Sequence, residues 1–171
     1  MTPRATLILV NLVGGIAVLV SYYLGLSSPH AASGAIWGGV PESARTLYST
    51  SMLCAATGYF PLSWLLIFGS DPGRSRPIEL PVLYLLVLIP SALWLPLTDA
   101  YLDAPGPAGW WAIKLVLAAT ALGSLGLLRA VLRAEPAPSP TLRWLALLGG
   151  LAFCFQTVVL DAIVWVLLFP T

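Results

Sequence analysis

Five long apolar stretches take up most of this 171-residue chain, and its few charges lie almost entirely at their ends. A helix needs about 20 mostly apolar residues to cross the hydrocarbon core of a bilayer. Five segments meet or nearly meet this length: residues 5–26, 46–68, 78–97, 110–132 and 142–169. Since backbone polar groups in lipid have to bond within the protein, we expect an all-α bundle of five transmembrane helices. Residues 1–171 would form one transmembrane domain.

The composition supports a membrane location and excludes some partners. Charged residues make up 9% of the chain, whereas a soluble domain has about a quarter. The net charge of +1 argues against nucleic acid as a partner. We therefore expect an integral, multi-pass protein in contact with membrane lipid, in a bacterial-type plasma membrane.

The basic residues predict the orientation of the helices. Lysine and arginine accumulate in the short loops on the cytoplasmic side of a membrane. Six of the eight basic residues fall on one predicted side: Arg4, Arg74, Arg76, Arg129, Arg133 and Arg143. Arg45 and Lys114 fall on the other side. The N-terminus is thus expected inside and the C-terminus outside.

Polar residues within the spans gather in the predicted outer half. Charges in a membrane are costly, so each needs a partner or a role. Lys114 with Asp161 and Arg45 with Asp99 are the expected ion pairs, and Gln156 lies deeper. These groups can brace helix ends, form the polar rim of a pocket that opens outward, or belong to an ion or proton pathway.

Aromatic residues favour the same predicted half. Tyr22, Tyr23, Trp37, Trp94, Trp110, Trp111 and Trp165 map there, whereas Trp64 and Trp144 map to the inner half. Belts of tryptophan at membrane interfaces are common. The one-sided distribution is also typical of an aromatic cavity for an apolar ligand, or of a surface for another membrane subunit.

Two features bear on how the predicted helices pack. Small residues recur along one face of the first stretch, including Gly14 and Gly25, and along the fourth, at Gly123 and Gly126. Such faces allow close helix packing, either within the molecule or in a homodimer. Pro90 lies inside the third stretch and is expected to bend it.

No motif for catalysis stands out in the sequence. The zinc pattern His-Glu-x-x-His, the Gly-x-Ser-x-Gly turn and a glycine-rich phosphate loop are all missing. Cys54 and Cys154 lie in apolar stretches and are interpreted as packing residues. An enzyme is thus the less favoured interpretation, and no metal or cofactor is assigned.

A short motif and the topology resemble a known family. The segment Leu93-Trp94-Leu95-Pro96 resembles the Leu-Trp-x-Pro segment in the third span of the tryptophan-rich sensory protein (translocator protein) family. The long loop 27–44, with Trp37 and Pro41, would take the place of that family's lid. The family's Lys-Pro-x-Trp-x-Pro-Pro run has no counterpart here. The resemblance implies a five-helix bundle, often dimeric, that binds porphyrins, sterols or similar molecules.

These observations lead to one preferred function and two alternatives. We expect a non-enzymatic membrane protein that binds an apolar or amphipathic ligand, such as a tetrapyrrole, isoprenoid or lipid. The expected site residues are Trp37, Trp94, Trp110, Trp111, Arg45, Lys114, Asp161, Gln156 and Asp99. The alternatives are an accessory subunit of a larger membrane complex and a small-solute transporter, which would need a polar path from Gln156 to Asn11.

Overall fold

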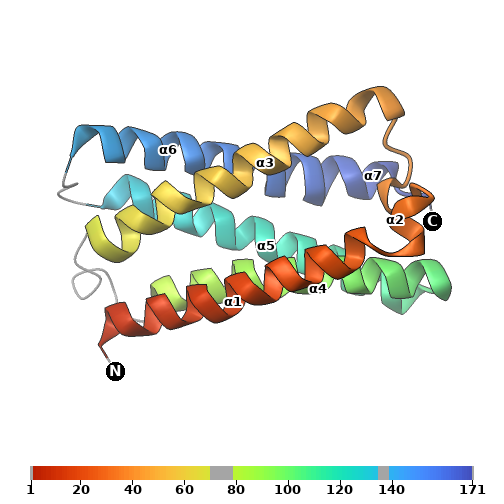
Figure 1. The fold of residues 1–171 in the computed structure, drawn as a ribbon, viewed down its shortest axis with the longest axis horizontal. Helices are drawn as coiled ribbons and strands as arrows, with labels where there is room; N and C mark the ends of the chain where they lie inside the picture. The colour runs from red at the N-terminus through yellow and green to blue at the C-terminus, as the bar shows by residue number, and fades with distance from the viewer. Residues whose placement is uncertain (1, 70–78, 135–138, 171) are drawn as a thin grey trace.

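The structure is a bundle of long helices that lie roughly side by side (Figure 1). It is a computed structural model that describes residues 2–69, 79–134 and 139–170. Five helical segments of the described residues are long and apolar enough to span a membrane. The predicted all-α bundle of five transmembrane helices is therefore confirmed.

Two of the five spans continue from an α-helix into a π-helix. The described elements are α1 (Pro3–Leu26), α2 (Pro29–Ala32), η1 (Ala35–Trp37), α3 (Glu42–Trp64), η2 (Leu65–Gly69), α4 (Glu79–Asp103), α5 (Pro107–Arg133), α6 (Pro140–Cys154), η3 (Phe155–Trp165) and α7 (Val166–Leu168). The π-helices are η2, which extends α3, and η3, which extends α6. Arg74, Arg76 and Ile78, which entered the predictions above, lie outside the described residues.

The helices extend further than the apolar stretches predicted. Helix α4 continues past Leu97 to Asp103 and is unbroken at Pro90 and Pro96. Helix α3 begins at Glu42, directly after Pro41. Polar residues at both ends can stay helical because they lie where the chain leaves the hydrocarbon. Hydropathy alone therefore predicts the start of α3 too late and the end of α4 too early.

Proline at the first helical position recurs where helices begin. Thr2, Ser28 and Ser139 each precede such a proline and accept a hydrogen bond from the backbone N–H three residues on. The proline lacks an N–H that would be unpaired there anyway, and the hydroxyl caps a free donor. These Ser/Thr-Pro pairs define the starts of α1, α2 and α6.

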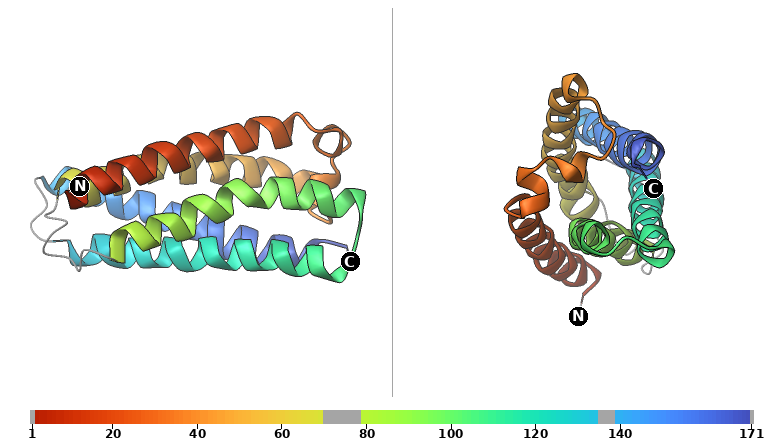
Figure 2. Two further views of the ribbon diagram at one scale, coloured as in Figure 1. Left: turned by 90° about the horizontal axis from the view of Figure 1, so that it is seen from below. Right: turned by 90° about the vertical axis from the view of Figure 1, so that its right-hand side faces the viewer.

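The helices pack in an order that differs from their order in the chain. Helix α1 packs on α4, α4 on α5, α5 on α6, and α3 on α6. Figure 1 shows α1 and α3 on the same face of the bundle, spreading apart toward the end that carries α2. We call this end, where the described chain also finishes, the α2 end. The view onto it in Figure 2 shows residues of the first connection crossing between the ends of α1 and α3.

Glycines allow the closest helix contacts. A Cβ on Gly58 of α3 would lie 2.6 Å from the Cα of Gly149 in α6, so the two backbones touch. Helix α1 meets α4 where Gly14 and Gly25 face Leu88 and Leu95. Small residues at such crossings drive helix association in lipid, where burial of apolar side chains gives little advantage. The small faces of the sequence are therefore used inside the molecule.

The outside of the bundle is apolar. Large side chains that are more than 70% exposed include Leu19, Phe60 and Leu167. Each belongs to a different span, so apolar surface faces outward around the bundle. In water such a surface would be unfavourable, and it fits the hydrocarbon of a membrane.

Candidate functional site

An aromatic cluster fills the α2 end of the bundle. Its members are Tyr22, Trp37, Tyr48, Trp94, Tyr101, Trp110, Trp165 and Phe169. Trp165 is its centre, with ring centroids 5.7 Å from Trp94, 6.2 Å from Trp110 and 4.5 Å from Phe169. Rings from α1, α3, α4, α5 and η3 therefore point inward rather than to lipid.

Residues 27–41 close the α2 end over this cluster. The backbone N–H of Gly39 donates to the carbonyl of Leu168 at 2.9 Å. The indole N–H of Trp165 donates to the carbonyl of Ile36 at 3.1 Å. Gly38 has a φ of 56°, in the left-handed region that favours glycine, and lies against Phe169. The end of the last span thus holds the first loop in place.

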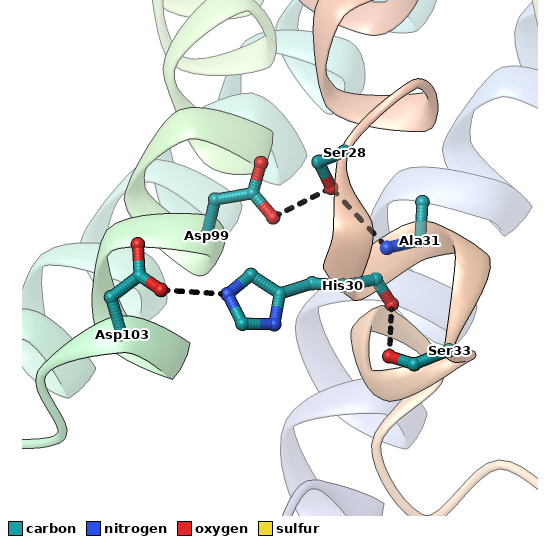
Figure 3. A network of polar contacts seen from close by, with 6 residues as sticks. All are labelled: Ser28, His30, Ala31, Ser33, Asp99 and Asp103. Atoms are coloured by element: carbon teal, nitrogen blue, oxygen red, sulfur yellow. Dashed lines mark hydrogen bonds and ion pairs between the residues drawn. The ribbon is translucent and has the colours of Figure 1, made fainter.

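Two acids of α4 tie the same loop from the other side, as Figure 3 shows. Asp99 accepts a hydrogen bond from the Ser28 hydroxyl at 3.0 Å. Asp103, one turn further along α4, contacts Nε2 of His30 at 2.9 Å. Each acid contacts its own loop residue, so Asp99 holds the loop and does not pair with Arg45.

Asp161 lies among the aromatic rings, on the π-helix η3. Its Oδ1 accepts a hydrogen bond from Nε2 of Gln156 at 2.8 Å. In an α-helix, residues five apart point about 140° away from each other. The wider i→i+5 repeat of the π-helix brings them onto one face. The acid and the amide are therefore neighbours because this stretch is not α-helical.

The groups around the Asp161 carboxylate are aromatic and uncharged. It interacts electrostatically with the hydroxyls of Tyr22 on α1 and Tyr48 on α3. The Tyr48 hydroxyl donates to the carbonyl of Leu160 at 2.6 Å, and the Tyr22 hydroxyl accepts from the Trp94 indole at 2.9 Å. Asp161, Tyr22 and Trp94 are each half-buried, although they point into the bundle.

The predicted ion pairs of the spans are not formed. His30 and Asp103 form an ion pair, but in the described part of the chain none joins Lys114 to Asp161 or Arg45 to Asp99. Lys114 instead places its Nζ 3.4 Å from the centre of the Trp111 ring, and that ring is 60% exposed. The shared side of the membrane predicts a pair of Lys114 with Asp161, but the two side chains have different partners in the structure.

Arg45 also lacks its predicted partner. Its guanidinium lies 5.8 Å from the centre of the Trp37 ring, beside Gly34 of the loop. Its Nε is buried and has no hydrogen-bond partner in the part of the chain that the structure describes. Arg45 therefore belongs to the contact between the loop and α3, above Tyr48.

The structure thus divides the predicted site residues into an inner and an outer group. Trp37, Trp94, Trp110, Asp161 and Gln156 are in or beside the aromatic cluster. Trp111 is exposed, Lys114 lies over both Trp111 and Trp110, and Asp99 anchors the loop. Tyr48 was not among the predicted site residues, although it follows Arg45 by three positions and lies on the same helical face.

The opposite half of the bundle has a separate polar group. The Tyr59 hydroxyl donates to Oδ1 of Asn11 at 2.6 Å, and Nδ2 of Asn11 donates to the Leu7 carbonyl. The Tyr59 ring packs against Phe153 and Tyr84. In the described residues no hydrogen bond connects this group to Gln156, so the two polar sites are distinct.

No protein-family model, curated protein or solved structure matches the chain significantly.

Proposed function

We propose that this membrane protein is not an enzyme and that it binds an amphipathic ligand at the α2 end. The site is bounded by Tyr22 and Trp94 on one side and by Tyr48 and Trp37 on the other. Asp161 lies at its base, and residues 27–41 cover it. The ligand would enter sideways from the membrane between α1 and α3, which lie on the same face of the bundle (Figure 1).

One observation carries this proposal. The aromatic rings and the acid point into the bundle, and Tyr22, Trp94, Trp37 and Asp161 each keep a minor part of their surface exposed. Ligand sites are typically concave, mostly aromatic or apolar, and contain a few polar groups that fix orientation. This combination supports ligand binding over simple core packing.

The inward direction of the rings also bears on the alternatives. An accessory subunit would use its aromatic side chains on the lipid-facing surface, whereas Trp94 and Trp165 contact each other inside. A transporter would need polar groups that connect the two halves, and the Asn11 group is separated from Gln156. Both observations favour the ligand.

We also propose that the α2 end faces outward across a bacterial-type plasma membrane. Of the described basic residues, Arg4, Arg129, Arg133 and Arg143 belong to the opposite end, and Arg45 and Lys114 to the α2 end. This distribution follows the positive-inside rule.

The first test compares two tryptophan variants. We expect native mass spectrometry in a mild detergent, with an absorption spectrum, to detect a small molecule on the wild-type protein. Trp94→Leu should lower its occupancy at least about tenfold, since buried tryptophans carry much of the binding energy in such sites. Trp144→Leu is the matched control, because Trp144 is 65% exposed and belongs to α6 at the opposite end.

Two results would contradict the proposal. One is a wild-type protein without any bound small molecule. The other is full occupancy in the Trp94→Leu variant. A polypeptide that co-purifies in place of a small molecule would support the accessory-subunit alternative.

A further inference from the structure

We infer that the ligand is a cationic amphiphile, with a protonated amine that pairs with Asp161 and an apolar body that lies between α1 and α3. This inference rests on the proposed function and adds the charge of the ligand's polar group. Four features of the site lead to it.

The first feature is a shortage of donors around Asp161. An ionised carboxylate only accepts hydrogen bonds, and the single side-chain donor on Asp161 in the described structure is Gln156. Gln156 is 4% exposed, and its own Oε1 is buried without a partner. Buried acceptors without donors are costly. An ammonium group has several N–H donors and would serve both residues.

The second feature is that the described cations at this end of the bundle do not pair with Asp161. Lys114 lies over the rings of Trp111 and Trp110, and Arg45 lies over Trp37. Neither forms an ion pair with Asp161 within the described ranges. A charged carboxylate within a membrane span is costly without a partner, and a positive charge on the ligand would supply that partner.

The third feature is the kind of group that surrounds the acid. Besides Gln156, Asp161 interacts electrostatically with Tyr22 and Tyr48, and Trp94, which bonds Tyr22, packs at right angles to Trp165. The face of an aromatic ring carries negative potential and attracts cations. A carboxylate among such rings favours an amine and disfavours an anionic head group, such as the carboxylates of a tetrapyrrole.

The fourth feature is the position of the acid along the bundle. Asp161 is eight residues before Phe169, so it lies inside the span and below the loop rather than at the surface. A small hydrated cation would have to cross this apolar region to reach it. An amine with an apolar body can approach through the lipid, with its tail between α1 and α3.

The test uses three probes of one chain length. N,N-dimethyldodecylamine, 1-dodecanol and dodecanoate are offered together to the protein in phosphatidylcholine nanodiscs, with empty nanodiscs as the blank. Native mass spectrometry identifies the bound probe. We expect the amine to bind wild-type protein at least about tenfold more tightly than the alcohol, since hydrogen bonds between charged groups are stronger than those of a neutral hydroxyl. Dodecanoate should bind most weakly.

Three variants assign this preference to Asp161. Asp161→Asn keeps the shape of the side chain and should bind the amine no better than the alcohol. Asp161→Glu keeps the charge and should retain the preference. Glu42→Gln removes an exposed negative charge at the start of α3 and should leave the preference unchanged.

The outcomes separate this inference from the proposed function. If the alcohol or dodecanoate binds wild-type protein as tightly as the amine, the site takes a ligand and the cationic head group is wrong. If no probe binds wild-type protein above the blank, the ligand site itself is wrong. The wild-type comparison decides between these cases even if Asp161→Asn does not fold.

Discussion

Single side chains at the α2 end hold together elements that are far apart in the chain. The Trp165 indole bonds the first loop, and the Tyr48 hydroxyl bonds the backbone of η3. Both donors are buried and satisfied, which amphipathic aromatic residues require. The same rings that would contact a ligand therefore also set the positions of α3, the loop and η3.

A variant of Tyr48 tests this structural role. Tyr48→Phe removes the donor to the Leu160 carbonyl and leaves that carbonyl without its side-chain partner. We expect a loss of about 1 kcal/mol in the free energy of unfolding, the usual net value of one hydrogen bond. Unfolding in mixed micelles of increasing SDS fraction measures it. Tyr23→Phe is the control, because Tyr23 is 74% exposed; equal losses in both variants would contradict the role.

At the scale of elements, the π-helix η3 is the feature that the sequence patterns did not predict. A helical repeat of 3.6 residues puts Gln156 and Asp161 on different faces, so no contact between them was predicted, although both were among the expected site residues. Single π turns occur often at functional sites. Here η3 brings an acid, an amide and Trp165 to the same end of the bundle as the loop.

The crossing of α3 and α6 provides a prediction for a pair of helices. In Gly58→Ala the new Cβ would lie 2.6 Å from the Gly149 backbone, so the helices have to separate. Overpacking of this kind costs about 1–3 kcal/mol. We expect a lower midpoint in SDS unfolding for Gly58→Ala only. Gly15→Ala is the matched control in a span, because a Cβ there meets nothing within 4 Å.

An unchanged midpoint in Gly58→Ala would mean that the two helices are not in backbone contact. A similar loss in Gly15→Ala would point instead to a face of α1 that packs on another molecule.

At the scale of the whole molecule, hydropathy was sufficient for the number and type of the helices. A backbone that crosses lipid has to satisfy its hydrogen bonds within the protein, so long apolar stretches form transmembrane helices. The partners of Asp161 and Arg45 could not be predicted, because depth in the membrane does not specify the direction in which a side chain leaves its helix. Lys114 and Asp161 share a depth and still point to different neighbours.

The orientation of the bundle can be tested with two cysteines. In a background with Cys54→Ala and Cys154→Ala, Ser33→Cys introduces a thiol at the exposed loop and Thr141→Cys one at the opposite end. We expect a membrane-impermeant maleimide to label Ser33→Cys in intact bacterial cells and Thr141→Cys only after permeabilisation. The reverse pattern would invert the proposed orientation.

The order of helix packing has a consequence for biosynthesis. Helix α1 packs on α4 and α3 on α6, so each of the first two spans enters the membrane before its partner has been made. In that interval, lipid or the insertion machinery has to cover the helix faces that later pack against α4 and α6. Asp161 and Trp165 follow in the last of the described spans, and the Trp165 indole bonds the loop through the Ile36 carbonyl. A chain interrupted before η3 would insert four spans and still lack both the acid and the ring that holds the loop closed.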